Sequence, residues 1–246
     1  MKRLLWLTLL LGMVFSHAPN LMAADAAKQC EQLTSQEKFK EAFSLCKQAA
    51  EQGDARGQSI FGWMYLNGHG VAQDYGEAVK WFRKAAEQGN DAWTQTVLGS
   101  TYLNGQGVAQ DYGEAAKWFR KAAEQGHAFA QFNLGLMCDN GWGVAQDYGE
   151  AVKWWRKAAE QGNADAQFGL GLAYAGGLGV LRSGTAAADW YYKAGLSFLK
   201  DGNKEMALTS VEKIKDLQKK GMSVPNAFLA DKLLTAIYGD SPERQE

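Results

Sequence analysis

The chain has few of the residues that interrupt helices, cross-link segments or bind metals. Its 246 residues include three prolines, three cysteines and three histidines. Scarce proline excludes a collagen-like chain, and a hydrophobic fraction of 46% is that of a folded soluble protein. No zinc-ligand spacing, Gly-x-Ser-x-Gly motif or phosphate loop is present. We therefore expect no metal, no cofactor and no enzymatic activity, with a cell-wall-related enzyme as the last alternative.

An excess of positive charge is also missing, because 26 basic residues face 27 acidic ones. Nucleic-acid binding calls for a basic stripe, so a nucleic-acid partner is not expected.

A long apolar run is found at the N-terminus. Lys2 and Arg3 precede an apolar stretch over residues 4–15, and small residues follow in "LMAADAA". This order is typical of a cleavable signal peptide over residues 1–24, cut between Ala23 and Ala26. The run is shorter than the about 20 residues of a membrane span. We expect a periplasmic or secreted protein with no integral membrane span after cleavage; an uncleaved anchor is the alternative.

Two of the three cysteines are placed to pair. Cys30 and Cys46 lie on opposite sides of a helical hairpin predicted to turn near residues 35–38. A secreted or periplasmic location permits disulfides. We expect a Cys30–Cys46 disulfide, with two buried thiols as the alternative, and Cys138 is left without a partner.

The sequence is rich in internal repetition. "GVAQDYGEAVKWFRKAAEQG" begins at Gly70 and returns at Gly107 and Gly143, with one position changed in each later copy. A period of 36 or 37 residues predicts a solenoid of helical pairs that stack on their neighbours. The period is set by four glycines: Gly53, Gly89, Gly126 and Gly162.

Each repeat is predicted to be a helix, a glycine-rich turn and a second helix. The first helix of the first repeat spans 55–66 and ends at "NGHG". The second begins at Asp74, and Glu77 three residues on suggests a capping box in which each carboxylate accepts from a backbone N–H. This position makes the carboxylate pair a cap rather than a catalytic pair.

One apolar stripe follows along the second helix at helical spacing. Trp81 is expected to fill the gap between neighbouring repeats, while the small residues allow close approach. The stripe consists of Ala78, Trp81, Phe82, Ala85 and Ala86.

The mature chain is predicted to be a single all-α solenoid, right-handed, with capping helices at both ends. The capping helices near the C-terminus are expected at about 204–219 and 225–238. The divisions are 25–52 (N-terminal hairpin), 53–88, 89–125 and 126–161 (three repeats), 162–200 (a degenerate fourth repeat) and 201–246 (C-terminal cap).

These residues resemble the Sel1-like repeat family, which is related to the tetratricopeptide repeat, over roughly 53–195. The first full repeat carries the family pattern at Gln58, Gly62, Tyr65, Gly68, Gly70, Val71, Asp74, Ala78, Trp81, Lys84, Ala85, Ala86 and Gly89. Phe61 replaces the family leucine, and Cys138 replaces a tyrosine, which we interpret as a small buried side chain. The resemblance implies an adaptor that holds partners on a curved surface, without chemistry of its own.

A recognition site is expected where the repeats differ. In related stacks the first helices line the concave surface, and three columns of these helices vary. Aromatic residues and arginine are enriched at binding hot spots. The candidate residues are Arg56, Ile60, Trp63, Trp93, Phe129 and Asn133, with His69 and Trp142 from the variable turn as a second candidate edge. For each of them, packing within the stack is the alternative.

The sequence thus predicts a monomeric, non-enzymatic scaffold of the bacterial periplasm or envelope that binds a protein or peptide on its concave face. The alternative is a glycan-binding protein in which Trp63, Trp93 and Trp142 stack on sugars of peptidoglycan or an exopolysaccharide.

Overall fold

The computed structural model describes residues 24–89, 91–224 and 228–239, and every regular element within these ranges is a helix. The predicted signal peptide lies almost wholly outside the described residues. The chain divides into two compact units, Met1–Trp118 and Phe119–Glu246, and the boundary in the sequence falls within the helix Tyr112–Glu124.

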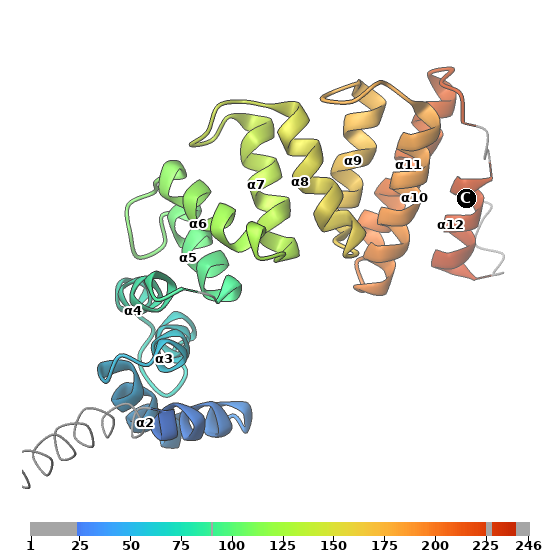
Figure 1. Ribbon diagram of the computed structural model, residues 1–246. Helices are drawn as coiled ribbons and strands as arrows, with labels where there is room; N and C mark the ends of the chain where they lie inside the picture. The colour runs from blue at the N-terminus through green and yellow to red at the C-terminus, as the bar shows by residue number, and fades with distance from the viewer. Residues whose placement is uncertain (1–23, 90, 225–227, 240–246) are drawn as a thin grey trace, which may run out of the picture. The chain divides into compact units, whose positions relative to one another are not determined.

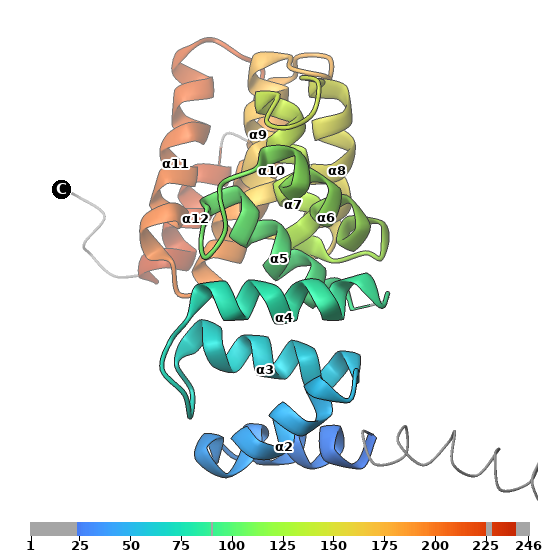
Figure 2. The same ribbon diagram turned by 90° about the vertical axis from the view of Figure 1, so that its left-hand side faces the viewer.

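Unit 1 is built from a helical hairpin and helix-turn-helix repeats (Figure 1). Residues 24–35 form the first arm of the hairpin. The helices that follow are α2 (Phe39–Glu51), α3 (Ala55–Asn67), α4 (Tyr75–Glu87), α5 (Ala92–Asn104) and the first part of α6 (Tyr112–Glu124). Figure 2 shows α3 and α4 side by side, as expected for the two helices of one repeat.

Unit 2 continues the pattern and ends in the predicted capping helices (Figure 1). The helices after α6 are α7 (Ala128–Asn140), α8 (Tyr148–Glu160), α9 (Ala164–Gly176), α10 (Gly184–Lys200), α11 (Lys204–Lys219) and α12 (Leu229–Tyr238). Residues 225–227, where the last helix was expected to begin, lie outside the described residues. The predicted all-α solenoid of helix-turn-helix repeats is confirmed.

The second helix of each copied repeat begins with an aspartate cap, as predicted. The side chain of Asp74 accepts a hydrogen bond from the backbone N–H of Glu77 at 2.9 Å, and Asp147 accepts in the same way from Glu150 at 2.9 Å. The cap satisfies one of the free N–H groups at the start of the helix. The first helices end on left-handed glycines, such as Gly68 with φ of 70°.

The other half of the predicted capping box is wrong. The backbone N–H of Asp74 donates to the carbonyl of Tyr65 at 3.0 Å, so no donor is left for Glu77 to reach back to. Glu77 pairs instead with Lys80 at 2.5 Å, one turn along the exposed face. The turn between the two helices therefore closes on a backbone hydrogen bond.

Two adjacent aromatic residues of the second helix take part in packing between repeats. Trp81 lies edge-on to Phe61 of its own repeat, with ring centroids 5.3 Å apart. Phe82, which is fully buried, contacts the ring of Trp93 in the next repeat, with centroids 6.0 Å apart. Trp81 also packs against the buried cluster that contains Ala42 and Cys46 of the hairpin, as predicted for a residue between repeats, and Phe82 adds the contact with the following repeat.

The same position in unit 2 explains a glycine in a variable column. Trp155 is wedged against Gly135 of its own repeat, where a Cβ would lie 2.5 Å from the indole, and against Gly169 of the next repeat, where a Cβ would lie 3.3 Å away. The copies that hold Phe82 and Phe119 at this position are followed instead by Val97 and Asn133 in the column of Gly169. The larger ring is accommodated by the smaller neighbour.

This pairing gives a double-mutant prediction. Gly169→Val should lower the free energy of unfolding by about 1–3 kcal/mol, because the added methyl groups overpack the site against Trp155. In a Trp155→Phe background the same change should cost clearly less. Chemical denaturation followed by circular dichroism measures both costs. Equal costs in the two backgrounds would mean that the two residues do not determine each other.

The corrected cap gives a second prediction. Asp147→Ala should destabilise the protein by about 1 kcal/mol through loss of the cap on α8. Glu150→Ala should leave the denaturation midpoint nearly unchanged, because its partner Lys153 is exposed to solvent and alanine is a good helix former. A loss for Glu150→Ala as large as that for Asp147→Ala would restore the reciprocal capping box.

Candidate functional site: an aromatic hollow in unit 1

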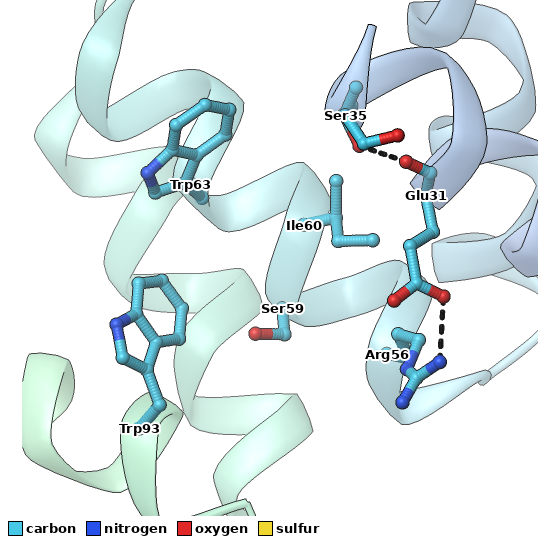
Figure 3. A pocket seen from close by; sticks show the side chains of 8 residues that line it. Glu31, Ser35, Arg56, Ser59, Ile60, Trp63 and Trp93 are labelled. Atoms are coloured by element: carbon cyan, nitrogen blue, oxygen red, sulfur yellow. Dashed lines mark hydrogen bonds and ion pairs between the residues drawn. The ribbon is translucent and has the colours of Figure 1, made fainter.

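Four of the predicted recognition residues meet in one hollow of unit 1. The hollow has a volume of about 360 Å³ and opens to solvent between the first hairpin arm, α3 and α5 (Figure 3). Its size is at the lower end of the range of ligand pockets. Its lining consists of Glu31, Thr34, Ser35, Arg56, Ser59, Ile60, Trp63 and Trp93.

Helical geometry brings these side chains together. Arg56, Ile60 and Trp63 are spaced by four and three residues on α3, so they share one face of that helix. Trp93 comes from the first turn of α5, one repeat later, and keeps 41% of its surface exposed. The result is an apolar wall of two indoles and one aliphatic side chain that stays accessible to a partner.

Trp63 is held in place by two further rings. His69 stacks on Phe39, with centroids 4.2 Å apart and planes 13° apart, and its ring lies 4.7 Å from that of Trp63. Phe39 also contacts Trp63 at 5.7 Å. His69 thus lies behind the hollow as a support for Trp63 and does not appear among the lining residues.

The rim of the hollow carries an ion pair that sequence reasoning missed. Arg56 Nη1 lies 2.6 Å from Glu31 Oε2, and both side chains remain largely exposed (Figure 3). Exposed pairs of this kind contribute little to stability, so either group can exchange its partner for a ligand group. Glu31 lies in the hairpin, outside the phased repeats; its position next to Cys30 is the signal that could have pointed to it.

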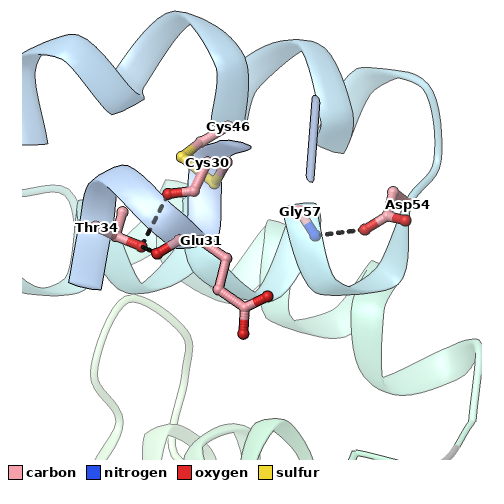
Figure 4. Close-up of a disulfide and its surroundings, with 6 residues drawn as sticks. All are labelled: Cys30, Glu31, Thr34, Cys46, Asp54 and Gly57. Atoms are coloured by element: carbon pink, nitrogen blue, oxygen red, sulfur yellow. Dashed lines mark hydrogen bonds between the residues drawn. A yellow bond between two sulfur atoms is a disulfide. The ribbon is translucent and has the colours of Figure 1, made fainter. Parts of the chain in front are cut away.

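A disulfide ties this arm of the hollow to the rest of unit 1. Cys30 and Cys46 are joined and fully buried, as the sequence led us to expect (Figure 4). Thr34 Oγ1 donates to the carbonyl of Cys30 at 2.9 Å, which orders the end of the same helical arm. The covalent link therefore limits the movement of Glu31 and Thr34 relative to α2.

The floor of the hollow contains a small polar network between the first helices. Ser59 and Thr94 share a hydrogen bond of 2.6 Å, and Thr94 Oγ1 donates to Asp91. Asp91 also caps α5 by accepting from the backbone N–H of Trp93 at 3.1 Å. The cap holds the backbone of Trp93 in place. The position of its indole is therefore set by backbone hydrogen bonding as well as by packing.

The remaining predicted residues do not join this hollow. Phe129 and Trp142 belong to unit 2, where 48% and 38% of their surfaces are exposed. Asn133 is 7% exposed, and its Nδ2 donates to the carbonyl of Phe129 at 2.8 Å. Asn133 therefore takes part in packing and offers little to a partner.

Cys138 lies in the core of unit 2, at 2% exposure. Burial raises the pKa of its thiol above the ordinary value, while Arg120 lowers it and Glu150 and Asp147 raise it. A thiol with a raised pKa stays protonated and reacts slowly. This environment agrees with a packing role for Cys138.

Within residues 24–89, 91–224 and 228–239, no three His, Cys, Asp or Glu side chains are grouped so that they could hold a metal ion. In the same part of the chain, no helix has both the length and the apolar character needed to cross a membrane.

The family model for the Sel1 repeat matches five segments of the chain: 34–54, 57–90, 95–127, 128–163 and 164–196. These segments cover more than half of the sequence, so the chain belongs to the Sel1 repeat family. The first segment lies in the N-terminal hairpin, where the sequence predicted a cap. Sel1 repeat proteins generally serve as protein–protein interaction scaffolds.

The solved structures that are similar to this chain include two with more than 30% identity. One is c5321, a protective antigen present in uropathogenic Escherichia coli strains, with 33% identity and a TM-score of 0.75. That match covers 88% of this chain and 47% of c5321, so the chain spans about half the length of that protein. The other is a Sel1 repeat protein from Oxalobacter formigenes, with 31% identity, a TM-score of 0.72 and coverage of 87% and 82%. No curated protein matches the chain.

The disulfide beside the hollow gives a third prediction. In the denatured, unreduced mature protein one thiol should react, that of Cys138, and three should react after reduction. Replacing Cys30 and Cys46 by serine should lower the free energy of unfolding by about 3 kcal/mol, because a loop of 16 residues is no longer closed. Thiol counting with a chromogenic reagent and denaturant titration measure the two effects. Three reactive thiols before reduction would show that the disulfide is absent.

Proposed function

We propose that this protein is a scaffold of the bacterial envelope that binds an extended segment of a partner protein in the hollow of unit 1. The observation that carries the proposal is that four residues from variable repeat positions, Arg56, Ile60, Trp63 and Trp93, line one accessible hollow. Arg56 and Trp93 differ between otherwise similar repeats and remain exposed, so stacking does not dictate their identity. Indole and guanidinium groups are also those most enriched at binding hot spots.

The lining favours a partner segment with one large apolar side chain and polar groups beside it. Such a side chain would bury apolar surface against Trp63, Trp93 and Ile60. The ion pair of Arg56 with Glu31 can hydrogen-bond the peptide groups of an extended chain from the rim. The disulfide holds one wall in place, which reduces the ordering cost of binding.

The proposed location is the periplasm or the extracellular space. Its support is the basic and apolar N-terminal sequence followed by small residues. A buried Cys30–Cys46 disulfide also fits an oxidising compartment. Cleavage within residues 23–26 would leave the helical arm that carries Cys30 and Glu31 in the mature protein.

A glycan ligand in the same hollow is the second candidate, because Trp63 and Trp93 lie on one wall and indole faces are good platforms for sugars. Trp142, the third tryptophan of that hypothesis, belongs to unit 2. Titration of the tryptophan fluorescence with muropeptides separates the two candidates, since a protein partner predicts no saturable change with these sugars.

The fourth prediction tests the hollow directly. A photocrosslinking residue placed at Trp93 in the full chain, expressed in the native host, should capture a specific protein. The same residue at Lys215, an exposed position of α11, should not capture that protein. Because Trp93 is substantially exposed, the substitution should leave the fold intact, as circular dichroism can verify.

Binding of the captured partner to purified variants then measures the contribution of the hollow. Trp93→Ala and Arg56→Ala should each weaken binding by about tenfold or more, as expected for hot-spot residues. Leu181→Ala, which truncates an exposed apolar residue of unit 2, is the matched control and should bind like the wild type. Equal affinity of all variants would overturn the assignment of this hollow as the binding site.

A further inference from the structure

The two helices of the copied repeats have diverged to very different extents. The first helices, α3, α5 and α7, are identical at four of 13 positions, whereas the second helices, α4, α6 and α8, are identical at eleven of 13. The first and second helices alternate with the same period, so duplication of whole repeats gives both helices the same age and does not explain the difference. The second helices have been kept the same for a reason of their own.

Stacking explains only part of this identity. The buried positions of the second helices must fit their neighbours, but the unchanged set also includes five charged positions on the outer face. Their side chains reach solvent: Lys80, Lys117 and Lys153 are 69%, 69% and 74% exposed. Exposed helix positions usually tolerate substitution with little loss of stability. A function of the outer surface accounts for their retention.

That surface forms an equivalent pocket in each unit. In unit 1 a pocket of about 440 Å³ lies between α4 and the turn residues Gly107 and Val108 of the next repeat. In unit 2 a pocket of about 570 Å³ lies between α8 and the turn residues Gly179 and Val180. The lining residues occupy the same repeat positions in both pockets, so the two pockets present the same chemistry.

Each pocket contains two cations without an acidic partner. Lys84 Nζ lies 4.2 Å from the centroid of the Trp81 ring, and Arg83 donates to the hydroxyl of Tyr102. Neither has a carboxylate within ion-pair distance among the described residues.

Unit 2 repeats this arrangement. Lys157 Nζ lies 4.2 Å from the centroid of the Trp154 ring, and Arg156 donates to the hydroxyl of Tyr174 at 2.9 Å. Again, no carboxylate of the described residues lies within ion-pair distance of either cation.

The pockets also contain hydrogen-bond acceptors. Glu87 lines the unit 1 pocket, and Glu77 lines it while paired with Lys80. Three cations against two carboxylates leave each pocket with one net positive charge. A ligand that fits must therefore supply both negative charge and hydroxyl or amide donors.

We propose that these repeated outer pockets bind an acidic polysaccharide, one carboxylate-bearing sugar in each pocket. Lys84 and Arg83, or Lys157 and Arg156, would bind the carboxylate through charge-assisted hydrogen bonds. The glutamates accept hydrogen bonds from sugar hydroxyls. A repeated site suits a ligand that is itself repetitive, and the two carboxylates in each pocket disfavour polymers as densely charged as polyphosphate.

The degenerate fourth repeat marks where this surface ends. Lys193 lies over Trp190 at 4.3 Å, but Asp189 and Tyr192 stand where the copied repeats have Lys80 and Arg83. This repeat keeps the packing residues and lacks two of the three cations. The cation set is thus separable from the requirements of the fold.

The test is calorimetric titration of the full mature chain with a short oligogalacturonate at low salt. We expect saturable binding to two or more equivalent sites, weakened by added salt. Lys84→Ala and Lys157→Ala should each remove one site, and the double variant should lower the overall affinity by about tenfold or more. Lys215→Ala with Lys219→Ala removes the same charge from α11 and should leave binding unchanged.

Ligand controls decide the chemical class. The carboxyl-reduced oligosaccharide, which is neutral, should not bind, and polyphosphate of similar length should bind more weakly than the oligogalacturonate. Failure of the oligogalacturonate to bind, unchanged affinity of the Lys84→Ala and Lys157→Ala double variant, or equal binding of polyphosphate would overturn the proposal. Because the variants lie outside the aromatic hollow, capture of a protein through Trp93 is unaffected by either result.

Discussion

The structure depends on the contact between a buried aromatic side chain of the second helix and a glycine of the first helix that receives it. Trp155 against Gly135, and Tyr191 against Gly171, leave no room for a Cβ on the glycine. Glycine inside a helix costs about 1 kcal/mol relative to alanine, but burial of a large ring in close contact offsets this cost. These contacts fix the distance between the two helices of a repeat. That distance then determines which of the other side chains are buried in the core and which are exposed to solvent.

Much of the fold could be predicted because stacking makes every repeat meet the same demands. The period, the aspartate caps and the left-handed glycines follow from local backbone chemistry, which a sequence displays directly. Whether Glu77 would hydrogen-bond the backbone N–H of Asp74 could not be predicted from the sequence. The answer depends on whether that N–H already has a partner, and in this structure it donates to the carbonyl of Tyr65. Trp81 and Phe82 are adjacent and both apolar, so periodicity could not decide which of them contacts the next repeat.

The candidate site was predictable to a smaller degree, because positions vary between repeats for two physical reasons. Trp93 is variable and accessible, which is what recognition requires. Gly169 is variable because it complements the larger ring of Trp155, and Asn133 of the same column is buried. Variation at one repeat position therefore does not by itself distinguish a residue that binds a partner from a residue that compensates for a change in a neighbouring side chain. Glu31 was missed because the hairpin is out of phase with the columns, although it completes the rim of the hollow with Arg56.

The same contacts allow one unit to carry two different surfaces. In unit 1, the aromatic hollow is built on α3, α5 and the hairpin arm. The outer pocket is built on α4 and the turn residues Gly107 and Val108 of the next repeat. The ring of Phe82 is fully buried and takes part in neither lining. Changes on distant, independent surfaces of a packed protein are usually additive. The residues of the first helices can therefore change to suit a partner while the second helices keep their charge pattern. Unequal divergence of the two helices is what such independence predicts.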